Sequence, residues 1–234
     1  MGTNVDWLER SVKDQWRAHG YDNVMSLREA AAVKHYTGSG YAEINAALRT
    51  NAAPTGASAS LSVFKKAARA LNDVLARLGT PSEGYVYRGV NPERVGAATE
   101  DVIKDYVIGK TVTWPAFTSS TTRKATADAF GGRIYFIIEA KTPRPVKNLS
   151  AYPGENEVLF RAGTKFEVLD VKKLPDGRYR VVLAESSAAP KVKARTKLTP
   201  AQQLAADEFE KGILENRPPD ADAAHLSDKS STSF

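Results

Sequence analysis

The change of residue pattern after Gly79 restricts the fold of this chain more than any other feature. Before Gly79, apolar residues recur at the spacing of an α-helix. After it come runs rich in β-branched and aromatic residues, which are GYVYRGV, TVTWPAFTSS, RIYFIIEA, EVLFRAGTKFEVLDVKKL and RYRVVLAE. Helices first and strands afterwards predict an α+β domain.

Local signals place the ends of the predicted elements. Ser26 and Glu29 have the spacing of a capping box, which predicts that a helix begins there and runs towards Tyr36. Pro175-Asp176-Gly177 predicts a hairpin turn between the last two strands. Helices are expected over about residues 7–16, 27–36, 41–49, 61–78 and 123–130, with a break at 37–40 and a loop at 51–60.

The same pattern predicts three parts of the chain. Residues 1–24 form an N-terminal helical segment, and residues 25–185 form the main domain. Residues 186–234 contain a basic linker, a short helix over about 200–214 and a polar tail whose composition predicts disorder.

Composition excludes several kinds of chemistry. The 234 residues include no cysteine, which excludes disulfides and thiol chemistry, and the three histidines lie too far apart to predict a metal site. The net charge of +6 favours acidic or phosphate-bearing partners. The charged N-terminus does not resemble a Sec signal peptide, and no stretch approaches the roughly 20 apolar residues of a membrane span, so no membrane partner is expected.

Two glutamates stand close together in AYPGENEVLF, at residues 151–160. If a strand has already begun there, Glu155 and Glu157 project from one face of it. Paired carboxylates suit chemistry at an anomeric carbon, where one stabilises an oxocarbenium-like centre and the other handles a proton. A solvated strand edge is the alternative interpretation, and the pair alone does not decide between the two.

An arginine ends the first apolar strand, in Tyr87-Arg88-Gly89. An arginine beside a glycine suits a diphosphate or carboxylate ligand, because the glycine lets the ligand approach the backbone. The alternative is that Arg88 packs its stem on the sheet and extends its head to water. The hydroxyl run from Thr118 to Thr121 either caps the following helix or orients a neighbouring carboxylate.

Two further groups suggest a ligand site. Phe130 and Arg133 flank a Gly-Gly turn, which brings a flat ring and a cation close together. Tyr41 and Asn45 are four residues apart and share one helix face. Core packing of Tyr36 and Tyr41 is the alternative for these aromatic residues.

The order of these motifs resembles the Arg–Ser–Glu class of mono-ADP-ribosyltransferases, in particular bacterial toxins of the clostridial binary type and their exoenzyme relatives. YTGSGYAEINAALR is similar to the NAD-contacting helix of that family, and YPGENEVLFRAGTKFEVL is similar to its turn-turn loop and following strand. The resemblance covers roughly residues 25–185. It implies N-terminal helices packed on two roughly perpendicular, mainly antiparallel β-sheets around one NAD cleft.

The resemblance also implies a role for each candidate residue. Glu157 is the catalytic glutamate, Ser119 holds it by a hydrogen bond, and Glu155 and Tyr152 face the acceptor. On the NAD side, the implied ligands are Arg88, Gly89, Tyr36, Tyr41, Asn45, Phe130 and Arg133, with no metal. The middle motif reads Ser-Ser-Thr where the family more often has Ser-Thr-Ser, and its first serine is kept.

The implied activity is transfer of ADP-ribose from NAD to an arginine of a target protein, because Glu at the first position of the pair accompanies arginine acceptors in the family. The alternatives are a nucleic-acid acceptor, hydrolysis of NAD, or an inactive binding module with the same fold. The resemblance further implies action in the cytoplasm of a target or host cell, and an inhibitor or delivery partner.

Overall fold

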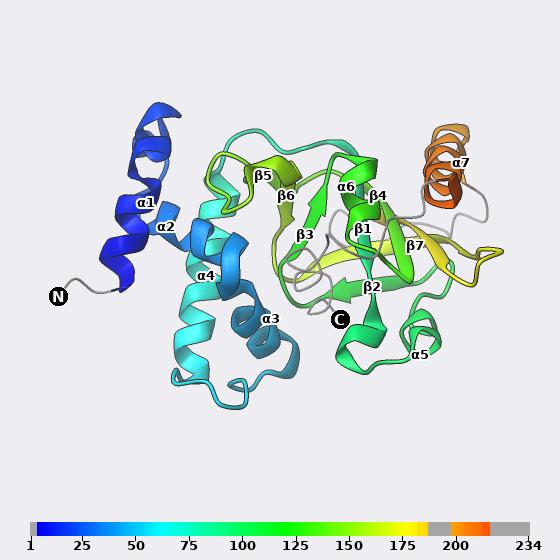
Figure 1. The fold of residues 1–234 in the computed structure, drawn as a ribbon, viewed down its shortest axis with the longest axis horizontal. Coiled ribbons are helices and arrows are strands. Elements are labelled where there is room, and N and C mark those ends of the chain that lie inside the picture. The colour runs from blue at the N-terminus through cyan, green and yellow to red at the C-terminus, as the bar shows by residue number, and fades with distance from the viewer. Residues whose placement is uncertain (1–3, 187–197, 216–234) are drawn as a thin grey trace.

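The structure is a computed structural model that describes residues 4–186 and 198–215 (Figure 1). Its α-helices are α1 (Asn4–Ala18), α2 (Leu27–His35), α3 (Tyr41–Thr50), α4 (Leu61–Arg77), α5 (Thr99–Ile103), α6 (Lys124–Ala129) and α7 (Pro200–Glu215). Its strands are β1 (Gly84–Val90), β2 (Thr111–Trp114), β3 (Thr118–Thr121), β4 (Ile134–Ala140), β5 (Arg144–Pro145), β6 (Glu157–Phe160), β7 (Thr164–Lys173) and β8 (Tyr179–Glu185). The predicted α+β class is confirmed.

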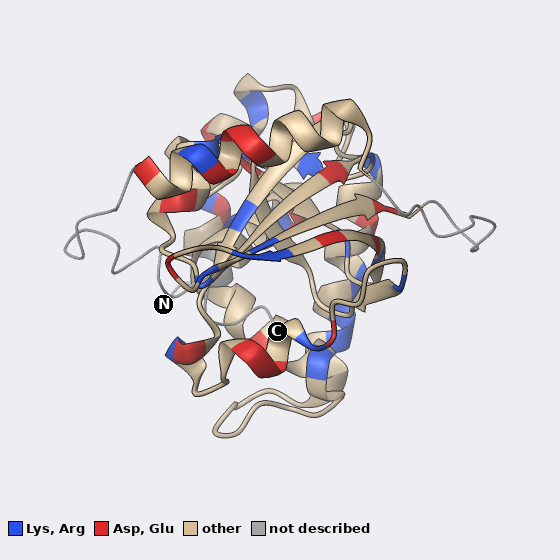
Figure 2. Cartoon of the chain, turned by 90° about the vertical axis from the view of Figure 1, so that its right-hand side faces the viewer, with Lys and Arg blue, Asp and Glu red and all other residues tan. Residues whose placement is uncertain are grey.

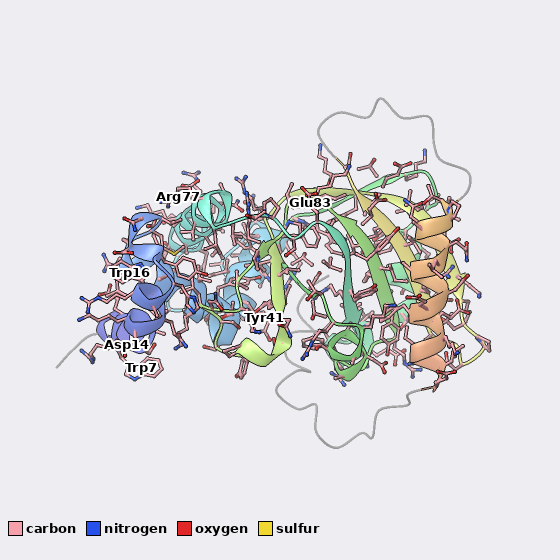
Figure 3. All side chains as sticks on the ribbon, turned by 90° about the horizontal axis from the view of Figure 1, so that it is seen from above. Trp7, Asp14, Trp16, Tyr41, Arg77 and Glu83 are labelled. Carbon is pink, nitrogen blue, oxygen red and sulfur yellow. The ribbon has the colours of Figure 1, made fainter. Side chains whose placement is uncertain are left out.

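The first four helices form a layer at one end of the molecule. In Figures 1 and 3 they lie on one side of the strands, and α7 lies at the opposite end. Apolar side chains of these helices form one core cluster with Phe117, Leu149 and Leu159, so the layer is packed against the edge of the sheet that carries β3 and β6. No helix in the described part of the chain is long and apolar enough to span a membrane.

The predicted capping box at the start of α2 is confirmed. The Ser26 hydroxyl accepts a hydrogen bond from the Glu29 amide at 3.2 Å, and the Glu29 carboxylate accepts one from the Ser26 amide at 2.8 Å. Two amide groups that a helix start leaves without partners are satisfied in this way.

We expect Ser26→Ala to lower the free energy of unfolding by about 1 kcal/mol, because the cap is lost while the fold is kept. Ser60 provides a matched control, since it stands at the N-cap of α4 but its side chain makes no capping hydrogen bond. Ser60→Ala should therefore change the stability by much less, as measured by chemical denaturation of both variants. Equal losses in the two variants would contradict this assignment.

The predicted break at residues 37–40 is wrong. A π-helical turn over Tyr36–Gly40 joins α2 to α3 without interruption. Glycine is a helix-breaking signal in sequence, but here Gly40 leaves room for a neighbouring ring: a Cβ at this position would lie 2.3 Å from Nε2 of His35, so that ring would have to move. The wide turn also places Tyr36 and Thr37 in the interior.

The strands form one mixed sheet in the order β2-β7-β8-β4-β1-β3-β6-β5. All neighbouring strands are antiparallel except β4 and β8, which are parallel. The two separate perpendicular sheets that were expected are not shown, because hydrogen bonds join all eight strands. However, β1 and β3 share a single residue pair, Tyr87 with Thr121, and this pair is the junction between two parts of the sheet.

The C-terminal part contains the short helix that was predicted. α7 begins at Pro200 and ends at Glu215, and Figure 2 shows it lying across the strands. The basic linker and the polar tail lie outside the described residues, apart from the few at their ends.

Candidate active site

Arg88 lies at the junction between β1 and β3. Its side chain is buried, and Nη1 donates a hydrogen bond to the carbonyl oxygen of Ser119. Burial lowers the pKa of Arg88 to about 10, against the opposing effect of neighbouring Tyr36, Tyr106 and Glu157. Nη2 is buried and has no hydrogen-bond partner within the described residues. A buried guanidinium with a donor to spare is suited to bind an anion.

The two glutamates are both buried, with 7% of Glu155 and 2% of Glu157 exposed. The alternative of a solvated strand edge is therefore wrong. The condition under which both would project from one face of a strand is not met, because Glu155 ends a 3₁₀ turn (Pro153–Glu155) and β6 begins at Glu157. Asn156 between them has φ of 47°, a left-handed conformation that turns the chain between the two carboxylates.

Hydroxyl groups from neighbouring segments hold this turn and this strand. Thr121 donates a hydrogen bond to the carbonyl oxygen of Glu155 at 2.7 Å, and Ser150 donates one to Oε2 of Glu157 at 3.3 Å. Neither residue was among the candidates from sequence. The hydroxyl run from Thr118 to Thr121 is the sequence feature that could have identified Thr121. No sequence feature singles out Ser150.

Ser119 shares one face of the sheet with Glu157. Thr121 is the register partner of Glu157, and Ser119 lies two residues before Thr121 on β3, so both β3 side chains point to the face of Glu157. The hydrogen bond from Ser119 to Glu157 stays a prediction. The hydroxyl run pairs with β6 in the sheet, and its last member also contacts the start of α6, because Thr121 Oγ1 accepts a hydrogen bond from the amide of the N-cap residue Arg123 at 3.0 Å.

Tyr36 and Asn45 bind the helical layer to the segment before β3. Asn45 Nδ2 donates to the Tyr36 hydroxyl at 2.9 Å and to the carbonyl oxygen of Phe117 at 3.2 Å. Burial raises the pKa of Tyr36 well above its usual value, so its hydroxyl stays protonated. The Tyr36 ring also packs against Phe117 and Tyr41, and Figure 3 shows Tyr41 on the side of the helical layer that faces the strands.

Arg49 is a cation that the candidate list from sequence did not include. It stands four residues after Asn45 on α3, and this helical spacing was the signal that could have found it. Its Nη1 is buried and has no hydrogen-bond partner in the described part of the chain, and burial lowers its pKa. Arg49 lines a pocket of about 190 Å³ with Tyr106, Trp114 and Thr118 among its other walls.

Gly89, Phe130 and Arg133 lie around α6. A Cβ at Gly89 would come within 2.4 Å of the Ala127 carbonyl oxygen, so this glycine is required by the close approach of α6. Phe130 is buried at the end of α6. The Arg133 side chain is 48% exposed and forms an ion pair with Glu93 at 3.1 Å.

The remaining candidate, Tyr152, is 38% exposed and precedes the turn that carries Glu155. The structure therefore brings Arg88, Ser119, Glu155 and Glu157 to one junction, with Tyr36, Asn45 and Arg49 beside it. The Arg133 amide bonds to the Val90 carbonyl oxygen, and its side chain is held in the surface pair with Glu93. Among the described residues, no three acidic or histidine side chains gather where they could hold a metal ion.

Fold and geometry together define a class of protein: an α+β domain that brings a buried carboxylate and a buried guanidinium to one junction of its sheet, where they can stabilise positive charge and bind an anion. The model of the ADP-ribosyltransferase exoenzyme family matches residues 13–190, and the chain belongs to this family.

Known proteins resemble this chain in sequence and in fold. NAD(+)–arginine ADP-ribosyltransferase Mav of Mycobacterium avium (strain 104) is 38% identical over 60% of the chain, and NAD(P)(+)–arginine ADP-ribosyltransferase 2 of Gallus gallus is 30% identical over 76%. The chain spans 16% and 55% of the lengths of these two relatives. ADP-ribosyltransferase HopU1 of Pseudomonas syringae pv. Tomato has a similar fold, with a TM-score of 0.64, 21% identity, and coverage of 80% of this chain and 89% of that one.

Proposed function

We propose that this protein transfers ADP-ribose from NAD to an arginine side chain of a target protein and releases nicotinamide. The observation that carries the proposal is that the buried Arg88 and the buried Glu157 both meet β3 at the β1–β3 junction: Arg88 donates to the Ser119 carbonyl oxygen, and Glu157 is the register partner of Thr121. The family match and the two relatives named as arginine ADP-ribosyltransferases support it.

The residues present suit the parts of NAD. Arg88 and Arg49 each have a buried guanidinium nitrogen without a partner among the described residues, and a diphosphate carries the oxygens that such donors bind. The side-chain oxygen Oδ1 of Asn45 is also buried and has no hydrogen-bond partner among the described residues. We propose that these groups, with Tyr36 and Tyr41, line the NAD cleft, and that Gly89, Phe130 and Arg133 contact NAD from the side of α6. The parts of the sheet on either side of the junction would then form the two walls of the cleft.

The reaction breaks the bond between C1′ of the ribose and the nicotinamide nitrogen. The electron pair of that bond leaves with nicotinamide, which is neutral, so no general acid is needed there. Positive charge develops on the ribose, and we propose that the buried Glu157 carboxylate stabilises it. A guanidino nitrogen of the acceptor then forms the new bond to C1′ and gives up a proton.

Glu155 is the group that we assign to the acceptor. A guanidinium has a pKa above about 12, so it reacts only if a carboxylate pairs with it, orients it and takes its proton. Glu155 and the exposed Tyr152 lie together on the turn before β6. We propose that the chemistry uses no metal and that the target protein lies in the cytoplasm of a host cell. We also propose that an inhibitor or a delivery partner binds this protein.

Labelled NAD distinguishes this function from its alternatives. The full chain is incubated with NAD carrying a label on the adenosine part and with a cell lysate, and modified residues are identified by mass spectrometry. We expect label on protein arginine together with released nicotinamide. Label on nucleic acid would favour a nucleic-acid acceptor, and nicotinamide release without any labelled macromolecule would favour NAD hydrolysis.

The exposed Arg133 gives a prediction about NAD binding. We expect Arg133→Ala to weaken NAD binding by about tenfold, near the low end for a charge-assisted contact, because this side chain is half exposed and must first leave Glu93. Calorimetric titration of NAD measures the change. Glu93→Gln is the matched control: it removes the competing partner and should leave binding unchanged or slightly tighter. Unchanged affinity in Arg133→Ala would place this residue outside the site.

A further inference from the structure

α7 lies outside residues 13–190, which match the family model, yet it is packed firmly on the catalytic domain. Figures 1 and 3 show it on the side of the strands away from the N-terminal helices. Its buried residues form a cluster with side chains of β1, β4 and β8, and the members that α7 contributes are Ala205, Ala206, Phe209 and Ile213.

Polar contacts on four elements fix the position of this helix. Gln202 donates to Glu139 on β4 at 2.6 Å, and Glu210 pairs with Lys172 on β7 at 2.6 Å and with the buried Arg180 on β8 at 3.3 Å. Glu208 pairs with Lys124 on α6 at 2.6 Å. Although exposed pairs contribute little singly, together they define one register for α7 on the sheet.

Phe209 connects α7 to the catalytic junction. Its ring is buried, with its centroid 4.8 Å from that of Tyr87 and 5.7 Å from that of Tyr135. Tyr87 is the β1 residue of the single pair between β1 and β3, and Arg88 follows it directly. Lys124, the α6 partner of Glu208, lies over the same Tyr87 ring at 5.8 Å.

The junction pair continues into the turn that carries Glu155. Thr121, the partner of Tyr87, donates its hydroxyl hydrogen bond to the Glu155 carbonyl oxygen and is the register partner of Glu157. A chain of direct contacts therefore runs from Phe209 through Tyr87 and Thr121 to Glu155. Because β1 and β3 share one pair only, no further ladder pairs between them would hold the junction if Tyr87 moved.

We propose that Phe209 is a positioning residue and that α7 belongs to the catalytic unit. By supporting Tyr87, Phe209 fixes the position of the Glu155 turn relative to Arg88 and Glu157, and so sets the share of NAD that reaches an arginine acceptor rather than water. The proposal rests on the proposed function, because that share is defined only for an enzyme that transfers ADP-ribose.

The expected effect follows from the different demands of the two reactions. Removing the ring leaves a cavity behind Tyr87, and neighbouring groups relax into it. Transfer requires a guanidinium held in line with C1′, and a misplacement of about 1 Å can cost about 100-fold in such a step. Attack by water does not require Glu155 to orient the attacking group, and Glu157 still stabilises the positive charge. Transfer should therefore fall further than hydrolysis.

The test compares Phe209→Ala with Ile213→Ala in the full chain. Both positions are 1% exposed on α7 and belong to the same core cluster. Phe209 forms the ring pair with Tyr87, and Ile213, one turn further along the helix, serves as the control for lost core packing. Nicotinamide release and labelling of an arginine acceptor are measured in the same preparation. Their ratio does not depend on the fraction of folded enzyme, so a purely structural loss leaves it unchanged.

We expect the ratio of labelled acceptor to released nicotinamide to fall by about tenfold in Phe209→Ala, within the range for small misplacements, and to stay within about twofold in Ile213→Ala. Phe209→Leu should restore part of the ratio, and it carries the test if the alanine variant does not fold. An unchanged ratio in the Phe209 variants, or an equal fall in both alanine variants, would overturn the proposal. Failure of the proposed function is distinguished from this, because the unmodified chain would then label no arginine.

Discussion

Replacing Glu157 with glutamine is expected to abolish both nicotinamide release and acceptor labelling. Both reactions pass through the same positively charged ribose, and glutamine keeps the shape of the side chain and an oxygen that can accept from Ser150. Only the charge is removed, so the loss reports the electrostatic role of the carboxylate. We expect a decrease of about 10² to 10³-fold or more, as for removal of a preorganised electrostatic partner.

Initial rates with saturating NAD measure this decrease, and thermal unfolding shows whether the variant remains folded. Glu83→Gln is a suitable control, because Glu83 is exposed and lies just before β1, outside the proposed site. Near-normal nicotinamide release by Glu157→Gln would refute the assignment of Glu157. Loss of activity in the Glu83 variant as well would point to a general effect of charge.

Glu155→Gln is expected to separate the two reactions. The variant should lose arginine labelling by about 10² to 10⁴-fold, the range for general-base catalysis, while slow hydrolysis of NAD continues. Water needs no carboxylate to orient it as a guanidinium does, and Glu157 still stabilises the ribose. Glutamine also leaves the backbone contact of this turn intact, since Thr121 bonds to the carbonyl oxygen of Glu155 and not to its side chain.

Parallel assays on one preparation decide the outcome for Glu155. Loss of both activities together would mean that Glu155 also acts on NAD, and equal retention of both would mean that it has no role in the chemistry. Thr121→Val provides a comparison, because it removes the hydrogen bond to the turn while both carboxylates remain. We expect it to lower transfer more than hydrolysis, in the same direction as Glu155→Gln and by a smaller factor.

Much of the fold follows from local patterns. The capping box at Ser26, the helix near residue 200, the hairpin turn at Pro175-Asp176-Gly177 and the strands after Gly79 are all found in the structure. Each depends on interactions within a few residues, which a sequence displays directly. The run TVTWPAFTSS is harder to assign from sequence, because it contains two strands with different partners. β2 pairs with β7, and β3 pairs with β6.

The structure differs from the sequence-based predictions at residues whose conformation is decided by distant neighbours. Gly38 and Gly40 predicted a break, but the helical layer continues as a π-turn in which Gly40 accommodates the ring of His35. Whether a strand has begun before Glu155 is open from sequence, and the left-handed conformation of Asn156 decides that β6 begins only after it. Thr121 and Ser150, which bond to this turn and to Glu157, reach them from other segments, and no local pattern reveals these contacts.

The sequence by itself determined the α+β class, the order of the elements and most of the candidate residues for the proposed chemistry, because helix and strand periodicity and the spacing of motifs are local properties. Only the tertiary structure decided how Arg88, Ser119 and the two glutamates meet, because that meeting depends on one residue pair between β1 and β3. Arg49 and Phe209 became visible for the same reason. Their neighbours lie far away in the chain, and contacts between distant segments are fixed by packing rather than by local preference.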